Sequence, residues 1–231
     1  MSTKRNNDGE EKSSEFTDAQ VASIEETHNF IERLEFAAER ERQKLIAPGL
    51  AKRDETLNAI PGFWRAAFKN SLVYLQVASF DEDAKALEFL SKIRGWRDPE
   101  QPKAFGVELH FDPNPFFSNT VLKKEFKYVA PSDPEALKKD ENGVCQADID
   151  FDFDRDVDVV TTKIEWKEDK KNLIKLFPRV FDTDEPDEIV EDGSFFHFFE
   201  DSKVRDALSL RFMRAHPSSS IIQLKGPSEV R

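Results

Sequence analysis

A seven-residue apolar repeat within residues 17–60 constrains the fold more than any other feature of the chain. Ile24, Ile31, Ala38 and Leu45 recur at seven-residue intervals, and Val21, His28 and Leu34 fill the adjacent stripe. Thr17 and Gln20 have the spacing of a capping box, which predicts that a helix begins there. Because residues three, four and seven apart share a helix face, the repeat predicts one long helix with a narrow apolar seam. Charged side chains occupy the other faces, so burying the seam requires a partner.

Two partners can cover such a seam. One is a second copy of the chain, and the other is the protein's own domain. No neighbouring segment has the pattern of a second helix of matching length, so we favour pairing between copies, with the seven seam residues as the dimer interface. Pro48 and Gly49 should kink or end the helix, after which an apolar stripe continues to Pro61.

The remainder of the chain has the pattern of helices followed by strands. Residues 61–97 read as two short helices, the second capped by Asp81. Its expected inner face consists of Ala84, Leu87, Leu90 and Ile93. The period then becomes two over residues 105–111 and 121–129, which predicts an antiparallel sheet in an α+β fold. A further strand is expected through Ile164 and Trp166, and Ser194 is a candidate cap for a final helix reaching about Arg214.

Four segments follow from these patterns. Residues 1–16 read as a disordered leader, 17–60 as the long dimerisation helix kinked near Pro48, 61–215 as the α+β domain and 216–231 as a mobile tail. The leader and the tail are assigned from their polar composition.

Aspartate occupies every even position from Asp148 to Asp158. On a strand, this alternation would place six carboxylates on one face and apolar side chains on the other. Neighbouring carboxylates would repel one another, and a basic partner would relieve that repulsion. The alternative is a solvated face or a partly ordered acidic loop, because aspartate is a poor strand former.

The charge of the chain limits the classes of partner. The net charge is −12 over 231 residues, which favours cationic partners and argues against direct binding to nucleic acid or an anionic membrane. The 21 Phe and 3 Trp residues supply enough apolar surface for a folded core. Cys145 is the only cysteine, which suits a reducing compartment. We expect neither secretion nor a membrane anchor, because the sequence has no signal peptide and no apolar run of membrane-spanning length.

The residues that usually carry catalysis are sparse. The chain has no glycine-rich phosphate loop, no nucleophile elbow, no zinc-protease motif and no Cys-x-x-Cys pair. The extended aspartate run lacks the glycine and closing glutamate of a calcium loop. We therefore expect a binding protein that is not an enzyme and that needs no metal or other cofactor.

Four segments in order resemble the nucleosome assembly protein family, and most closely its SET/template-activating-factor branch. They are residues 59–64 (AIPGFW), 107–126 with its HFDPNPFF and LKKEF motifs, 162–167 (TKIEWK) and 194–199 (SFFHFF). The resemblance covers roughly residues 18–200. It implies a long helix that pairs antiparallel with its twin, followed by an "earmuff" domain of antiparallel sheet and helices. It also implies chaperoning of core histones without ATP, and a nuclear location with exchange to the cytoplasm.

The resemblance also implies a site. The family's histone-contacting loop falls on Glu168, Asp169, Lys170 and Lys171, and the segment after the Phe-rich motif falls on Glu200 and Asp201. An acidic stretch beside these residues supplies further candidates, Asp182, Asp184, Glu185, Asp187 and Glu188. Either the central histone tetramer or the outer heterodimer fits such a surface.

Two departures from the family pattern leave alternatives open. Family members usually end in a long acidic tail, whereas residues 218–231 contain no acidic run. Either that tail lies outside this sequence or the folded acids suffice. The segment from Ser202 to Lys225 also departs from the helices expected there. The competing interpretation is a dimeric acidic scaffold for a non-histone basic protein.

Overall fold

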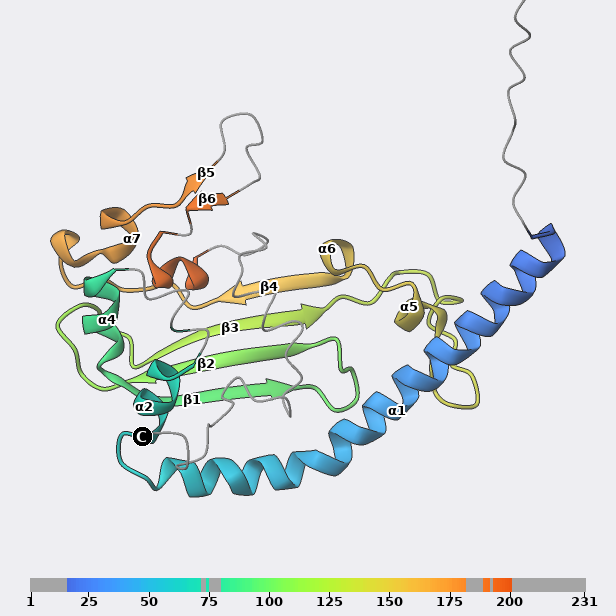
Figure 1. Ribbon diagram of the computed structural model, residues 1–231, viewed down its shortest axis with the longest axis horizontal. Coiled ribbons are helices and arrows are strands. Elements are labelled where there is room, and N and C mark those ends of the chain that lie inside the picture. Colours follow the sequence, from blue (N-terminus) through green and yellow to red (C-terminus); the bar gives the residue numbers. More distant parts are fainter. Residues whose placement is uncertain (1–15, 72–73, 75–79, 182–188, 192, 201–231) are drawn as a thin grey trace, which may run out of the picture.

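The structure is a computed structural model that describes residues 16–71, 74, 80–181, 189–191 and 193–200. A long helix, α1 (Asp18–Asn58), extends beyond the body that contains the sheet (Figure 1). The described elements of that body are, in chain order, α2 (Phe63–Lys69), α4 (Asp81–Leu87), β1 (Leu90–Arg97), β2 (Phe105–Phe111), β3 (Val121–Tyr128), α5 (Gln146–Ile149), α6 (Phe153–Asp156), β4 (Val157–Thr161), η1 (Asp169–Lys171), α7 (Leu173–Leu176), β5 (Val180–Phe181), β6 (Ile189–Glu191) and η2 (Phe195–Phe199).

Helix α1 begins at the predicted capping box. The Gln20 amide N–H donates to Thr17 Oγ1 over 3.3 Å, and the Thr17 amide N–H donates to Gln20 Oε1 over 2.9 Å. Pro48 lies inside the helix, which continues to Asn58 instead of ending. Figure 1 shows the helix changing direction part way along. Such a bend is expected of a helix that contains a residue without an N–H donor.

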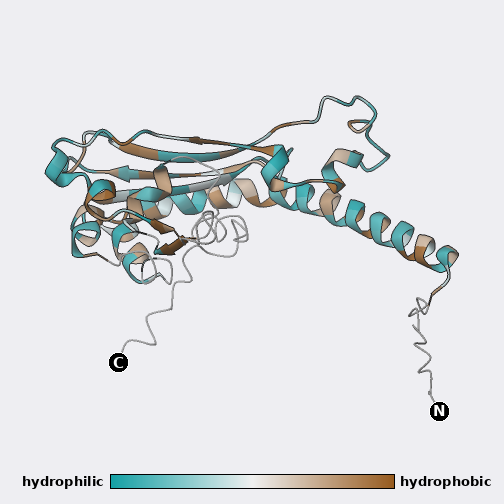
Figure 2. Ribbon diagram, turned by 90° about the horizontal axis from the view of Figure 1, so that it is seen from above, coloured by the Kyte–Doolittle hydropathy of each residue, from teal (hydrophilic) through white to brown (hydrophobic). Residues whose placement is uncertain are grey.

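The predicted antiparallel sheet is confirmed as a four-stranded meander in the order β1-β2-β3-β4. One face is apolar, and Leu109 on this face pairs with Ile93 on one side and Leu122 on the other. Helices α2, α4 and η2 contribute to the core on this face, and Figure 2 shows the hydropathy of the elements from above. The α+β fold class is therefore confirmed.

The opposite face of the sheet carries interleaved charges of both signs. Glu108 lies 3.6 Å from Arg94 Nη1 and 4.0 Å from Lys123 Nζ, and Lys123 also pairs with Glu125 over 2.9 Å. Trp96 lies flat on this face over Gly106, where a Cβ atom would approach the indole ring to 2.7 Å. Because its acids are matched by bases, this face has no excess of negative charge to attract a basic partner.

A buried carboxylate joins α4 to the Phe-rich segment. Asp83 Oδ1 accepts a hydrogen bond from Ser194 Oγ over 2.6 Å, and Asp83 Oδ2 accepts one from the Phe195 amide N–H over 2.8 Å. Ser194 Oγ in turn accepts from the Phe196 amide N–H over 3.2 Å, which confirms Ser194 as a cap. Every residue of η2 is buried. The polar pair Asp83 and Ser194 thus holds the aromatic segment on the core.

The helix predicted up to residue 97 is wrong beyond Leu87, because α4 ends there and Leu90–Arg97 is a strand. Leu90 and Ile93 both face the core although they are three residues apart. The pairing of β1 with β2 shifts between Leu90 and Lys92, which adds one residue to the strand. This bulge breaks the period of two and imitates the spacing of a helix.

The aspartate run is not one strand. Residues 146–149 and 153–156 form the short helices α5 and α6, and only Asp158 of the six aspartates lies in β4. Asp152 accepts hydrogen bonds from the amides of Asp154 and Arg155, both over 3.0 Å, and so caps α6. Aspartate side chains compete for backbone donors in this way, which explains why the apolar alternation did not produce a strand.

Only some of the predictions for the C-terminal part of the chain fall on described residues. The strand predicted through Ile164 and Trp166 is reduced to one bridge, between Trp166 and Phe117. The helix expected after Ser194 is a five-residue 3-10 helix, and residues 201–231 lie outside the described residues. Most of the predicted leader, the predicted tail and the last part of the 61–215 domain lie outside them as well.

Candidate functional site

Among the described residues, acidic side chains gather at one end of the sheet, whereas the acidic stretch from Asp182 to Glu188 lies outside the described residues. Residues 17–32, in the first part of α1, hold four acidic residues and no Lys or Arg. Residues 131–158, which include α5 and α6, hold ten acidic and three basic residues. Figure 1 shows α5 beside α1, and hydrogen bonds join the two elements. An acidic surface therefore forms where α1 leaves the body. Counting the charged residues of each segment in the sequence would have indicated which two segments contribute to it.

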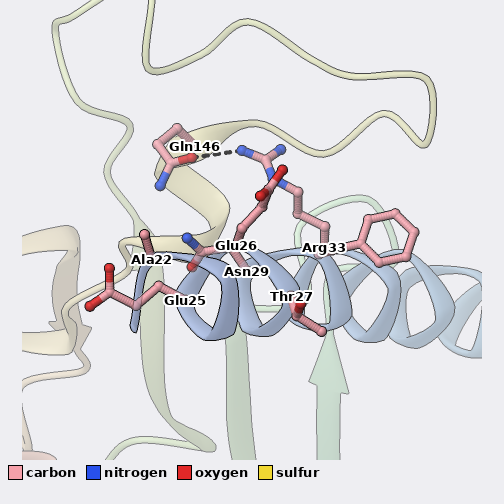
Figure 3. A pocket seen from close by; sticks show the side chains of 8 residues that line it. Ala22, Glu25, Glu26, Thr27, Asn29, Arg33 and Gln146 are labelled. Carbon is pink, nitrogen blue, oxygen red and sulfur yellow. Dashed lines mark hydrogen bonds between the residues drawn. The ribbon is translucent and has the colours of Figure 1, made fainter. Parts of the chain in front are cut away.

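An open hollow lies between the two acidic segments. It has a volume of about 710 Å³ and is lined by Ala22, Glu25, Glu26, Thr27, Asn29, Phe30, Arg33 and Gln146. Figure 3 shows Gln146 of α5 facing Arg33 across the hollow, with Glu26 on the same side of α1. Phe30, which lies outside the seven-residue repeat, is 57% exposed.

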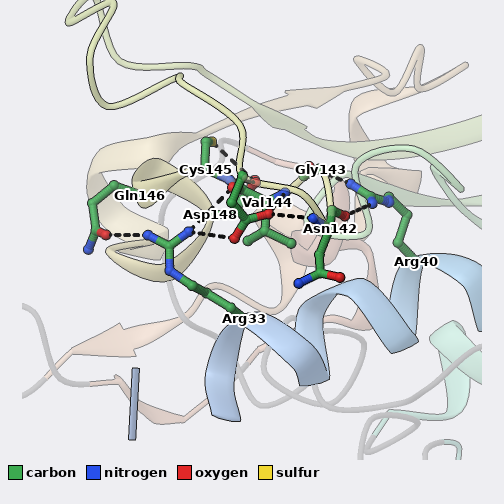
Figure 4. A network of polar contacts seen from close by, with 9 residues as sticks. Arg33, Arg40, Asn142, Gly143, Val144, Cys145, Gln146 and Asp148 are labelled. Carbon is green, nitrogen blue, oxygen red and sulfur yellow. Dashed lines mark hydrogen bonds and ion pairs between the residues drawn. The ribbon is translucent and has the colours of Figure 1, made fainter. Parts of the chain in front are cut away.

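Two arginines of α1 bind the loop that precedes α5 (Figure 4). Arg33 pairs with Asp140 over 3.0 Å and donates to Gln146 Oε1 over 2.6 Å. Arg40 donates to the carbonyl oxygens of Gly143 and Asn142 over 2.7 and 2.6 Å. This arginine clamp, Arg33 and Arg40, fixes the direction in which α1 leaves the body.

The conformation of the loop at Gly143 leaves room for the Arg40 side chain. Gly143 has a φ of +71°, and a Cβ atom there would lie 3.0 Å from Arg40 Nη2, so a larger residue is doubly disfavoured. The Val144 amide N–H donates to Asp140 Oδ1, and this bond together with Arg33 lowers the pKa of the Asp140 carboxyl. Asp140 is therefore ionised at neutral pH, when it pairs with Arg33.

Two aspartates of the run have structural roles. Asp148 is buried and accepts hydrogen bonds from the Cys145 amide N–H over 3.0 Å and from Gln101 Nε2 over 3.2 Å. Asp156 is also buried, pairs with Arg155, and accepts from the Asp152 amide N–H. The exposed members of the run are Asp150, Asp152, Asp154 and Asp158. Fewer carboxylates are thus available to a partner than the alternation predicted.

The loop taken from the family resemblance is exposed, but its charges are paired within the loop. Glu168 lies 2.8 Å from Lys171 and 2.9 Å from Lys170, and these ammonium groups lower the pKa of Glu168 to about 2. Asp169 pairs with Lys175 over 2.8 Å, which also lowers its pKa. Two carboxylates face three ammonium groups, so the loop as folded has no net negative charge.

A hollow of about 810 Å³ beside this loop also contains mostly basic polar groups. Trp166, Ile174 and Phe199 supply apolar walls, the charged lining residues are Lys163, Lys175, Arg179 and Glu200, and His197 also lines the hollow. Glu200 is exposed, and its Oε2 atom lies 2.7 Å from His197 Nδ1. The other predicted contacts, Asp182, Asp184, Glu185, Asp187, Glu188 and Asp201, lie outside the described residues.

All seven predicted seam residues are exposed in the single chain. Leu45 is 80% exposed and Ile24 is 56% exposed, which is unusual for large aliphatic side chains. Phe16, which the repeat did not include, lines an open hollow of about 540 Å³ with Ile24 and Ile31. The seam thus remains the leading candidate for contact with a second copy.

The side of α1 opposite the seam is the one that packs on the body. The residues of α1 that are half-buried or buried on that side include Arg33, Phe36, Arg40 and Gln43. They follow at spacings of three and four, which place them on one helix face. The prediction that α1 packs on its own domain and the prediction that it pairs with a twin are therefore compatible, because they concern different faces.

Among the described residues, no group of three or more His, Cys, Asp or Glu side chains is arranged to hold a metal ion. No helix in the described part of the chain is both long and apolar enough to cross a membrane. Cys145 is buried, and burial raises the pKa of its thiol.

Comparisons with known proteins agree on one family. The family model described as "Nucleosome assembly protein (NAP)" matches residues 5–218. Nucleosome assembly protein 1;3 of Nicotiana tabacum is 30% identical over 159 residues, which cover 67% of this chain and 36% of the relative. Protein SET of Drosophila melanogaster is 30% identical over 173 residues, which cover 74% of this chain and 56% of the relative. The chain therefore spans between about a third and somewhat more than half of these relatives.

Solved structures agree on the fold. The crystal structure of Ccp1 aligns with a TM-score of 0.54 at 20% identity, and the alignment covers 85% of this chain and 89% of that one. At this identity, the alignment carries information about the architecture alone.

Proposed function

Because the chain belongs to the nucleosome assembly protein family, we propose that it is an acidic, homodimeric histone chaperone. It would bind core histones, as the central tetramer, the outer heterodimer or both, and assist nucleosome assembly and disassembly without ATP. We place this activity in the nucleus, with exchange to the cytoplasm. The proposed protein is a binding protein and not an enzyme, with no tight binding to nucleic acid or membranes of its own.

The observation that carries the proposal is the acidic end of the molecule. The first part of α1 and residues 131–158 together present many carboxylates and few bases. Histones are strongly basic, and a chaperone must shield their charge from DNA while still releasing them. Many exposed carboxylates, each contributing a few tenths to about 1 kcal/mol, suit that task better than one deep pocket.

Neutralising the acidic end is expected to weaken histone binding severalfold. The test variant carries Asp150→Asn, Asp152→Asn and Asp154→Asn, which remove three exposed charges; Asn at position 152 can still cap α6. The control variant carries Asp81→Asn, Glu55→Gln and Glu191→Gln, which remove three exposed charges elsewhere. Fluorescence anisotropy with labelled histones at several salt concentrations should show weaker binding and a flatter salt dependence for the test variant only.

The same measurement on a further variant tests the histone-binding site that the family resemblance implies. Glu168→Gln combined with Asp169→Asn and Glu200→Gln is expected to have the smaller effect, because Lys170, Lys171 and Lys175 already offset the loop acids. Equal losses from every variant would indicate generic polyanion behaviour. Tighter binding to a ribosomal protein than to histones would favour the scaffold interpretation.

Histone binding is also expected to be independent of metal, nucleotide and thiol. Binding in nucleotide-free buffer with a chelator should equal binding without the chelator, and Cys145→Ser should change the affinity less than twofold. Serine can keep the hydrogen bond that Cys145 Sγ makes to Asp148 Oδ2 over 3.2 Å. A large loss in any of these measurements would restore a cofactor or redox role.

A further inference from the structure

The face of α1 that packs on the body continues past the edge of the body. Arg33 is the first residue of α1 that hydrogen-bonds to the loop before α5. On the same helix face, one to three turns earlier, lie Asn29, Glu26 and Ala22, which follow at spacings of four, three and four. All three are exposed. A stripe that the body covers at one end is therefore open at the other.

A large apolar side chain borders this open stripe. Phe30 lies at its margin and lines the hollow of about 710 Å³ together with Ala22 and Glu26. A phenylalanine exposed to 57% on a helix that is otherwise rich in charge is not explained by packing within the described chain. The hollow is bounded on its other side by Gln146 (Figure 3).

A second copy paired through the seam would leave this stripe open. The seam residues Ile24 and Ile31 lie on the side of α1 away from the body, whereas Ala22, Glu26 and Asn29 continue the body-facing side. A partner helix that covers the seam thus approaches from the opposite direction and would not cover the stripe.

The charges around the hollow indicate the chemistry of that occupant. Glu25 and Glu26 form no ion pair with any residue that the structure describes. The guanidinium of Arg33 is engaged by Asp140, by the Val144 carbonyl and by Gln146. Because residues 17–32 contain no Lys or Arg, the potential here is negative. Lys and Arg can pack their aliphatic stems on an aromatic ring while the charged end reaches a carboxylate.

We propose that Ala22, Glu25, Glu26, Asn29 and Phe30 form a histone-binding stripe on α1, separate from the sheet domain and from the dimer seam. A basic histone segment would place one Lys, Arg or apolar side chain beside Phe30 and its charge near Glu25 and Glu26. This inference rests on the proposed function, and it adds a contact that lies outside the earmuff domain.

The test uses the full chain with Phe30→Ala and Glu26→Gln, and the outer histone heterodimer as a labelled probe. Alanine and glutamine are good helix formers, so α1 should remain intact, which far-UV circular dichroism can check. The matched control is Ile60→Ala with Glu55→Gln, an exposed apolar residue and an exposed acid near the opposite end of α1, away from the acidic surface. Light scattering reports the oligomeric state of each variant, and anisotropy reports the affinity.

The expected result is an unchanged oligomeric state and an affinity that falls about fivefold or more in the test variant but not in the control, as for loss of one aromatic anchor. A test variant with a shifted monomer–dimer equilibrium would assign the stripe to the second copy and overturn the proposal. Unchanged histone affinity would also overturn it. If the wild-type protein binds no histone at all, the proposed function itself fails, so the two failures are distinguishable.

Discussion

Replacing both Ile31 and Leu34 with glutamate is expected to convert the protein into monomers of 26.6 kDa. These residues are 47% and 41% exposed in the single chain and lie in the middle of the seam. Burial of each large aliphatic side chain in a dimer contributes about 1.5–3 kcal/mol. Two glutamates on each of two facing helices would remove that contribution and add unpaired buried charge. Light scattering at micromolar concentration measures the mass directly.

A matched control separates the seam from general effects of surface charge. Val190→Glu with Leu176→Glu also converts two exposed aliphatic residues, but these lie on β6 and at the end of α7, far along the chain from the seam. This variant should remain a dimer. A wild-type protein that scatters as a monomer would show that the seam does not pair copies of the chain.

Asp83→Ala is expected to destabilise the folded chain by about 2–4 kcal/mol, because it leaves buried hydrogen-bonding groups without partners. The Phe195 amide N–H and the Ser194 hydroxyl both donate to this carboxylate, and the side chains of both residues lie in the interior. Loss of these bonds should loosen η2 and expose its phenylalanines. Urea unfolding followed by tryptophan fluorescence gives the change in the free energy of unfolding.

Asp83→Asn is the matched variant, because its amide oxygen can accept from the Phe195 N–H while its Nδ2 group donates to Ser194 Oγ. Burial raises the pKa of Asp83 above the ordinary 3.8, so the folded chain keeps this proton at pH values where the unfolded chain has released it. The contribution of this titration to stability is therefore complete below about pH 4 and is lost as the pH rises through the folded pKa. The Asn variant should lose less stability than the Ala variant and should lack this pH dependence. Equal losses from both variants would assign the effect to packing instead.

Local patterns predicted much of the architecture. The capping box at Thr17, the long helix after it, and the strands at residues 105–111 and 121–128 are all present. Each depends on interactions between residues close in sequence or on an unbroken period of two or seven. Family membership was recognisable for the same reason, since its motifs are contiguous segments that pack into the core.

Predictions failed where one local pattern had two structural solutions. Leu90 and Ile93 have helical spacing, yet a bulge places both on the core face of a strand. The alternating aspartates suit a strand, yet Asp152 caps a helix instead, and Asp148 and Asp156 are buried in hydrogen bonds. In each case, contacts with distant segments or the competition of side chains for backbone donors decided the outcome.

The order of the elements, the apolar seam and the net charge can be read from the residues alone, because they are properties of the chain in one dimension. The location of the charge cannot. The acids of residues 17–32 and 131–158 form one surface only because Arg33 and Arg40 bind a loop more than one hundred residues away. Likewise, the negative charges of Glu168 and Asp169 are offset by Lys171 and Lys175, whose ammonium groups lie within 3 Å of the two carboxylates in the folded chain. Electrostatic interactions depend on distance in space, so only the packed chain determines which charges a partner meets.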